Sequence, residues 1–377
     1  MTHAAGNQQL IEVIKAQIRK HPLRVISFRD YMDLVLYHET LGYYRNEKIK
    51  IGREGDFYTS SSVGSVMGEL IASYILKESL VESPSMRKIQ IVEWGGGNGR
   101  LALHILDELQ KQDPAIYDNL TYIMIESSSY HSRLQRENLQ SHRMKIVHMK
   151  ESEWLASDPH QGVFVLANEL LDAFPVHRIR RSGSSWQESH VAWNDNTSSF
   201  EEQWLPLQMD SPLSAYLEQA DLTFKEGQVA EINLHASQWI RTVANAMHDG
   251  RMIIIDYGTE ASELYAAHRM RGTLMCYRKH QAYDNPFIHS GEQDITAHVD
   301  FTACIEAAST AGFTRSKLQT QRDFMVEQGI LEKLQNHLDL DPFSEAAKKN
   351  RAIRQLLLSD QMSELFKVLI LTKDKSV

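Results

Sequence analysis

A glycine-rich segment carries the sharpest chemical signal in the sequence. Glu93-Trp94-Gly95-Gly96-Gly97-Asn98-Gly99 follows a short apolar run, residues 88–94, and precedes a segment with helical spacing, residues 100–110. A strand, a glycine turn and a helix in this order are typical of a site for a nucleotide-like cofactor. Glycines at positions 95, 97 and 99 permit a tight turn and let a ligand lie against bare backbone.

The residues around the turn favour one cofactor. A dinucleotide fingerprint would need glycine or alanine where the chain has Arg100, and the lysine-containing phosphate loop is absent. Glu93 suits the cationic S-adenosylmethionine and would repel a phosphate. Glu126 ends the second predicted strand, 121–126, where a carboxylate can accept both ribose hydroxyls. The alternative to a cofactor site is that the glycines only form a turn between a strand and a helix and that the glutamate is solvated, with no ligand bound.

Other polar residues follow predicted strands. Asn168 ends the run 162–168, Glu169 directly follows it, and Asp172 comes soon after. Asp256, with Tyr257 and Gly258, closes the run 251–258. Ligands bind at the carboxyl ends of strands in open α/β sheets. We expect Asn168 to contact the cofactor, although an Asn/Asp-rich cap of the following segment is the alternative.

The same residues suit a cationic acceptor. If the acceptor is a guanidinium, carboxylates must orient it and take its proton, so Glu169, Asp172 and Asp56 are the catalytic candidates. Asp56 has an equally good alternative as a turn cap. The aromatic residues near it either line a pocket as a lid or simply pack; they are Tyr43, Tyr44, Phe57 and Tyr58.

The order of apolar runs predicts the elements that position these residues. Helical spacing at 8–20, 27–39 (with Ser27 as N-cap) and 63–80 precedes the glycine turn. Beyond the turn, strand-like and helical runs alternate, which predicts an α/β fold with a mostly parallel, Rossmann-like sheet. The remaining predicted elements are helices at 128–140 and 298–311 and strands at 145–148, 314–319 and 365–372.

Two stretches break the alternation and are interpreted as substrate-side insertions. Residues 178–250 resemble a polar hairpin or meander followed by helices, and residues 320–362 resemble helices. We therefore expect an N-terminal helical lid at 1–84 and a catalytic domain at 85–377 that carries both insertions. Asp294 and His298 are four apart, but as a metal pair they are incomplete, so we expect no metal site. Thr296 is the better assignment there, as the N-cap of the helix at 298–311.

Composition narrows the class of protein. Forty basic and 49 acidic residues give a net charge of −9, so we expect neither a nucleic-acid nor a membrane partner. No run approaches the roughly 20 apolar residues of a membrane span. Two cysteines are too few for a disulfide scaffold, which favours a reducing, cytoplasmic setting. The oligomeric state is open, with a homodimer as one option.

Several long blocks resemble a known family. The chain is similar to the MidA family of class I S-adenosylmethionine-dependent methyltransferases, which includes a mitochondrial protein arginine methyltransferase needed to assemble respiratory complex I. The resemblance runs from about residue 27 to 313 and is carried by LGYY (41–44), IGREGDFYTSSSVGSVMGELIA (51–72), VEWGGGNGRLALHIL (92–106), NELLDAFPV (168–176), IIDYG (254–258) and GTLMCYRKHQAYDNPFIHSGEQDITAHVDF (272–301).

The resemblance implies methyl transfer from S-adenosylmethionine to an arginine of a partner protein. Two alternatives stay open. One is a methyltransferase of a small metabolite, and the other is an assembly factor that binds S-adenosylmethionine without turnover. Intact Glu169 and Asp172 beside an intact glycine turn weigh against the second.

Overall fold

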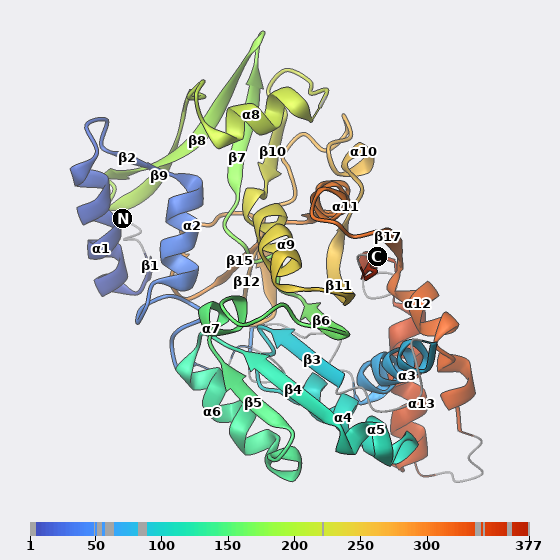
Figure 1. Cartoon of the computed structure of the whole chain (residues 1–377). Coiled ribbons are helices and arrows are strands. Elements are labelled where there is room, and N and C mark those ends of the chain that lie inside the picture. The colour runs from blue at the N-terminus through green and yellow to red at the C-terminus, as the bar shows by residue number, and fades with distance from the viewer. Residues whose placement is uncertain are drawn as a thin grey trace. The chain divides into compact units, whose positions relative to one another are not determined.

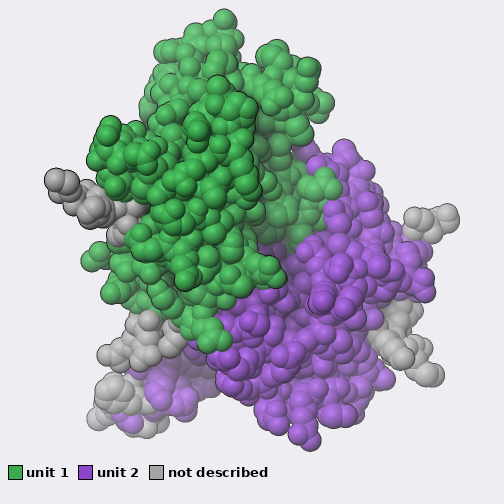
Figure 2. Space-filling view, turned by 90° about the vertical axis from the view of Figure 1, so that its left-hand side faces the viewer, with its two compact units in different colours: residues 1–57, 171–239, 259–304 green, residues 58–170, 240–258, 305–377 purple. Residues whose placement is uncertain are grey.

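The computed structural model describes residues 5–48, 50, 55–56, 64–81, 89–220, 222–335, 341, 344–359 and 364–375 (Figure 1). Two compact units, coloured separately in Figure 2, are each assembled from three segments of the chain. Unit 1 comprises Met1–Phe57, Leu171–Trp239 and Thr259–Cys304, and unit 2 comprises Tyr58–Leu170, Ile240–Gly258 and Ile305–Val377. This partition differs from the expected division at residue 84, because it joins the N-terminal helices to segments that are distant in sequence.

Unit 2 is built on a sheet with the strand order β17-β18-β11-β6-β3-β4-β5. Strands β11, β6, β3, β4 and β5 pair in parallel, and β18 is antiparallel to both β11 and β17. The predicted mostly parallel sheet is therefore confirmed. The strands are β3 Ile89–Trp94, β4 Leu120–Ile125, β5 Ile146–Met149, β6 Val163–Asn168, β11 Gly250–Thr259, β17 Arg315–Thr320 and β18 Phe366–Lys373.

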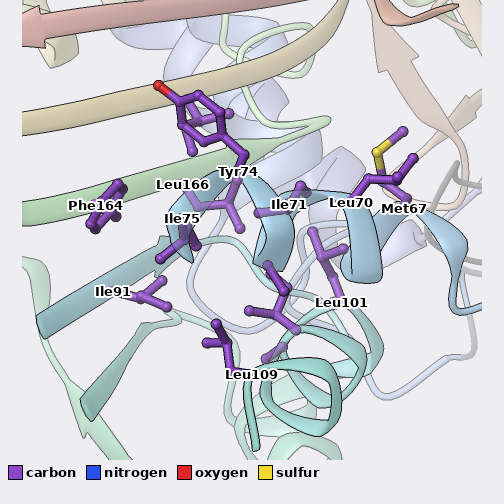
Figure 3. Close-up of a cluster of buried hydrophobic side chains, with 14 of the residues drawn as sticks. Met67, Leu70, Ile71, Tyr74, Ile75, Ile91, Leu101, Leu109, Phe164 and Leu166 are labelled. Carbon is purple, nitrogen blue, oxygen red and sulfur yellow. The ribbon is translucent and has the colours of Figure 1, made fainter. Parts of the chain in front are cut away.

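The inner strands are apolar almost throughout because helices cover them. Figure 3 shows Ile91 of β3 and Phe164 and Leu166 of β6 in one buried cluster with side chains of α3 and α4. Gly68 allows α3 to approach α4 closely, since a Cβ there would lie 2.5 Å from the Cβ of His104. The helices of unit 2 are α3 Val66–Val81, α4 Arg100–Gln112, α5 Pro114–Asp118, α6 Ser129–Asn138, η2 Gln140–His142, α7 Glu151–Leu155, α12 Gln321–Glu327, η3 Ile330–Lys333 and α13 Glu345–Leu358.

A buried ion cluster ties the C-terminal helices to α3. The carboxylate of Glu69 lies 2.9 Å from Nζ of Lys333 and 2.8 Å from Nζ of Lys349, and it accepts a 2.7 Å hydrogen bond from Ser65. Burial alone would raise the pKa of Glu69, but the bonds from Lys349, Ser65 and Lys333 together lower it to about 2. The folded state therefore favours the ionised carboxylate.

We expect Glu69→Gln to destabilise unit 2 by about 2 kcal/mol at neutral pH, because it removes the carboxylate that pairs with Lys349 and one of the two that pair with Lys333, which keeps Glu108 at 3.1 Å. The pKa of Glu69 is lower in the folded chain than the usual glutamate value of 4.5. Its stabilisation is thus fully present above that value and disappears as the pH falls toward 2. Urea unfolding at pH 7 and at pH 3 should show a smaller difference between wild type and variant at pH 3. Glu345→Gln is the control, because Glu345 pairs with Lys348 while 90% exposed; an equal effect of both substitutions would contradict the prediction.

Unit 1 contains the two predicted N-terminal helices. Helix α1 spans Gln8–Lys20 and helix α2 spans Phe28–Tyr37. As predicted, Ser27 caps α2, since its Oγ accepts the Asp30 N–H at 3.1 Å. Both helices bury one apolar face in a shared cluster with strand residues such as Val191 and Phe200.

Two antiparallel sheets make up most of the rest of unit 1. One has the order β10-β7-β8-β2 with β9 also paired to β8, and the other has the order β13-β12-β15. The hairpin predicted within 178–250 is present, but strand β10 lies where helices alone were expected. The elements within unit 1 are β1 Ala5–Gly6, β2 Val25–Ser27, β7 His177–Ser182, β8 Ser185–Asn194, β9 Ser199–Pro206, α8 Pro212–Gln219, β10 Val229–Ile232, α10 Ala261–Leu264, β12 Met275–Arg278, β13 Gln281–Tyr283, β14 His289–Ser290, β15 Asp294–Thr296 and β16 Val299–Asp300. Helices α9 Leu234–Ala246 and α11 Phe301–Thr310 begin in unit 1 and end in unit 2.

The prediction that Thr296 caps a helix is wrong. Thr296 belongs to β15 and pairs with Met275 of β12, and α11 begins only at Phe301. The side chain of Asp300 takes the capping role, accepting the Ala303 N–H at 3.1 Å. Asp294 therefore lies on a strand and does not share a helix face with His298. Within the described ranges, no helix is long and apolar enough to cross a membrane.

Candidate functional site

The glycine turn lies between β3 and α4 in unit 2, as predicted. Gly95, Gly97 and Gly99 have φ values of +63°, +52° and +80°, a region that side chains with a Cβ occupy at a cost. The Gly95 N–H donates to the carbonyl of Ile125 at 3.1 Å, and the Gly99 N–H donates to the Gly96 carbonyl at 2.9 Å. The turn is therefore a fixed backbone loop at the carboxyl end of the parallel strands.

Protein neighbours explain some of these glycines without a ligand. A Cβ at Gly95 would lie 2.9 Å from Leu170, and one at Gly99 would lie 3.2 Å from Leu139 of the chain after α6. A Cβ at Gly96 would lie 2.9 Å from the carboxyl carbon of Glu93. A side chain at Gly95, Gly96 or Gly99 would therefore meet protein atoms whether or not a ligand is bound.

Glu93 is buried directly beneath the turn. Its carboxylate accepts a 2.9 Å hydrogen bond from the hydroxyl of Tyr122. Burial and, to a lesser degree, the charge of Glu126 raise the pKa of Glu93 to about 7, although the bond from Tyr122 lowers it. A cationic ligand at the turn would stabilise the ionised form of Glu93. A cofactor contact by Glu93 stays a prediction.

Glu126 follows β4 and is held by two donors. The Ser128 N–H donates to Oε1 at 2.7 Å, and the amide of Gln135 donates to Oε2 at 3.4 Å. Ser128 also caps α6, whose first turn begins directly behind this carboxylate. Glu126 is only partly buried. Its restrained orientation fits the predicted hydrogen bonds to ribose hydroxyls.

Helix α6 supplies two residues that sequence reasoning missed. The fully buried Gln135 donates from Nε2 to the Gly97 carbonyl at 2.9 Å, and Asn138 donates to the Asn98 carbonyl at 2.8 Å. These side chains are three positions apart on one helix face. They hold consecutive carbonyls of the turn, and Gln135 links the turn to Glu126. In sequence they resemble an ordinary polar helix face, which is why no motif revealed them.

Strained backbone marks the end of β6. Glu169 has a φ of +53°, which costs a side-chain-bearing residue about 1–2 kcal/mol. Its N–H donates to the Ile255 carbonyl at 2.8 Å, and Asn168 Nδ2 donates to its carboxylate at 3.2 Å. The buried Asp256 accepts the next amide, that of Leu170, at 3.2 Å. Strain of this kind persists where surrounding structure enforces it, often at functional sites.

A carboxylate cluster of Asp56, Asp172 and Asp294 lies in unit 1. Burial and the charge of Asp172 raise the pKa of Asp294 to about 7; bonds from Tyr44 and the Ile295 amide oppose this, and Asp56 raises it further. Tyr44 donates to Asp294 at 2.6 Å, and Tyr43 donates to Asp56 at 2.8 Å. The crowded negative charge would be relieved by a cation.

Two of the predicted catalytic residues, Asp56 and Asp172, lie in this cluster, and their catalytic roles stay predictions. Asp172 is 6% exposed and interacts with Asp294, which sequence reasoning had considered only for a metal. Asp56 also accepts the Lys279 N–H at 2.7 Å, as its turn-capping alternative predicts. Phe57 and Tyr58 lie outside the described residues. In the described part of the chain, no three His, Cys, Asp or Glu side chains are grouped to hold a metal.

Fold and site together define a class. A mostly parallel sheet, a glycine turn between its central strand and a helix, and an acid after the next strand are features of Rossmann-like methyltransferases. The chain belongs to the family described as "Putative S-adenosyl-L-methionine-dependent methyltransferase", whose model matches residues 70–319. The resemblance to the MidA family is thereby confirmed, and S-adenosyl-L-methionine is the methyl donor of this family.

Individual relatives agree with this assignment. The chain is 28% identical to the protein arginine methyltransferase NDUFAF7 homolog, mitochondrial, of Drosophila melanogaster, over 82% of this chain and 72% of that protein. It is 24% identical to protein arginine methyltransferase NDUFAF7, mitochondrial, of Danio rerio, over 90% and 82%. A methyltransferase candidate from Burkholderia thailandensis, solved with S-adenosyl-homocysteine, has a TM-score of 0.84 at 28% identity and covers 98% of this chain and 94% of its own.

These relatives contradict the expected cytoplasmic setting. The Drosophila and Danio proteins are both named as mitochondrial. The expectation rested on low cysteine content, and both cysteines are indeed free and buried. Cysteine content reports on the redox environment and not on which reducing compartment holds a protein. The prediction of a cytoplasmic location, which was drawn from the low cysteine content, is therefore wrong.

Proposed function

We propose that this chain N-methylates arginine side chains of a partner protein. The observation that carries the proposal is the carboxylate cluster of Asp56, Asp172 and Asp294, in which burial, and after it the charge of Asp172, raises the pKa of Asp294 to about 7. A guanidinium ion matches such a cluster, because it is always charged and donates several hydrogen bonds in one plane. The names of the Drosophila and Danio relatives support the same acceptor.

We propose that the methyl donor binds at the glycine turn. We assign Gly95, Gly97 and Gly99 to its amino-acid end, Glu126 to its ribose, and Glu93 and Asn168 to supporting contacts. The ligand-facing backbone at Gly97 is restrained by Gln135, and the carboxylate of Glu126 is restrained by Ser128. When bound, S-adenosyl-L-methionine supplies an electrophilic methyl group.

The protein's own residues must bring a cation to that electrophile. Glu169 is our candidate to hold the acceptor nitrogen and accept its proton, with Asp172 and Asp56 orienting the guanidinium. Positive centres approach one another only where carboxylates offset their repulsion.

The partner is proposed to be a protein with a basic acceptor segment. The net charge of −9 favours such a partner over nucleic acid or an anionic membrane. The absence of nucleic-acid and membrane partners, and a homodimer, stay predictions.

Transfer from a donor labelled in its methyl group tests the proposal. The protein is incubated with a cell lysate, and the labelled products are separated by size and mapped by mass spectrometry. We expect label on a side-chain nitrogen of arginine in a protein. Label in a small metabolite would support the first alternative. Donor binding without incorporation above a no-enzyme control would support the second.

A further inference from the structure

Helix α6 carries a wholly buried glutamine beside the glycine turn. Gln135 is 0% exposed, and its Nε2 donates to the Gly97 carbonyl at 2.9 Å and to Oε2 of Glu126 at 3.4 Å. Both groups accept hydrogen bonds, so the amide nitrogen must face them. One side chain thus joins the two groups that are assigned to the amino-acid end and to the ribose of the methyl donor.

The other amide atom of Gln135 makes burial of this side chain costly. Its Oε1 is buried and has no hydrogen-bond partner among the residues that the structure describes. A buried polar atom without a partner destabilises a fold, whereas an apolar side chain of similar size would not have this cost. Packing alone therefore does not explain a glutamine at this position, and its contribution lies in the two groups that Nε2 holds.

The position of α6 does not depend on the amide of Gln135. Ser128 caps the helix by accepting the His131 N–H at 3.4 Å. Leu139, directly after the helix, is 1% exposed and belongs to the hydrophobic cluster that includes α4. Asn138 adds its own bond to the Asn98 carbonyl at 2.8 Å. Loss of the amide should therefore release its two partners while the helix stays in place.

The two bonds restrain different parts of the donor site. Because the peptide bond is planar, holding the Gly97 carbonyl also sets the direction of the Asn98 N–H. Glycine has the widest choice of backbone conformations, so this peptide group benefits most from an external restraint. At Glu126, Ser128 holds Oε1 and Gln135 holds Oε2, which together fix the plane of the carboxylate.

We propose that Gln135 is a positioning residue that couples the two ends of the donor site, by holding the Gly97 peptide group and the Glu126 carboxylate in one arrangement. This inference rests on the proposed placement of the donor, with its amino-acid end at Gly97 and its ribose at Glu126. Gln135 acts through these two groups and not by contact with the donor. Groups that are ordered before the donor arrives lose less conformational entropy when it binds.

Gln135→Met tests the proposal, because it removes both bonds while keeping the length of the side chain. With the full chain at pH 8, we expect calorimetry to show S-adenosyl-homocysteine binding weakened by about tenfold. Gln112→Met is the matched control, since Gln112 donates to Glu108 at 2.6 Å from the opposite end of α4, and its affinity should be unchanged. Thermal unfolding confirms folding, and Gln135→Asn, which withdraws the amide by one methylene, replaces Gln135→Met if that variant does not fold.

A charged variant gives a pH profile that a merely structural role would not produce. In Gln135→Glu at pH 8, a carboxylate would face the Gly97 carbonyl and Glu126, and we expect binding about 30-fold weaker than in the wild type. Once protonated, its hydroxyl can again donate one bond. The ratio of variant to wild-type dissociation constants should therefore fall by about threefold or more between pH 8 and pH 6. The ratio cancels the titration of Glu93, which both proteins share; a ratio that does not change with pH overturns the proposal.

A double-mutant cycle separates this inference from the proposed function. If Gln135 acts through Glu126, the loss of affinity in the double variant Glu126→Gln, Gln135→Met should be smaller than the product of the single losses. Losses that multiply, or unchanged affinity of Gln135→Met where Glu126→Gln weakens binding, overturn this inference alone. Unchanged affinity of Glu126→Gln overturns the placement of the ribose and the inference with it. None of these measurements uses an acceptor, so absent arginine methylation would overturn only the proposed function.

Discussion

Glu169→Gln should abolish most methyl transfer while leaving donor binding intact. The substitution preserves size but removes the charge that is needed to hold a guanidinium and take its proton. Loss of a positioned acid–base group typically costs about 100-fold or more in turnover. The backbone of Glu169 is held at a strained φ of +53°, and the hydrogen bond from Asn168 restrains the orientation of its carboxylate. Turnover is measured with labelled donor, and S-adenosyl-homocysteine affinity by calorimetry.

Two comparisons make the result decisive. Glu137→Gln changes an exposed residue of α6 in the same unit and should leave turnover unchanged. If Glu169 were structural, the melting temperature would fall first and activity would follow the folded fraction. Near-full turnover of Glu169→Gln on the true acceptor would refute this role and favour Asp172 or Asp56.

Gly97→Ala should weaken S-adenosyl-homocysteine binding by about tenfold to 100-fold. A methyl group would stand where the ligand is proposed to lie, and overpacking of this kind costs about 1–3 kcal/mol. Alanine at a φ of +52° also strains the backbone. Gly183→Ala controls for that strain, because Gly183 has a φ of +57° and a Cβ there would meet nothing within 4 Å. Both variants should lose similar stability, and only Gly97→Ala should lose affinity; unchanged affinity in a folded Gly97→Ala protein would exclude contact at this glycine.

Local patterns were sufficient to predict where the glycine turn, Glu126 and Glu169 lie along the strands of the sheet. The glycine turn, Glu126 and Glu169 each directly follow a short apolar run, and a buried parallel strand produces such a run by itself. Ser27 was recognisable as a cap because capping depends on neighbouring residues. The position of each of these residues in the fold depends only on its neighbours along the chain.

Long-range contacts could not be predicted in the same way. Asp294 joins Asp172 and Tyr44 only because unit 1 is assembled from three distant segments. The role of Gln135 depends on where α6 lies relative to the turn, and nothing in its own segment encodes that. The misassigned Thr296 shows the same limit, since pairing with β12 overrides its local capping preference.

A crystal structure of the chain with S-adenosyl-homocysteine tests the central claim most directly. The account predicts both ribose hydroxyls within about 2.5–3.0 Å of the Glu126 carboxylate, and the amino-acid end of the ligand against the backbone of Gly97. A ligand bound elsewhere, or a ribose that leaves Glu126 facing solvent, would contradict it.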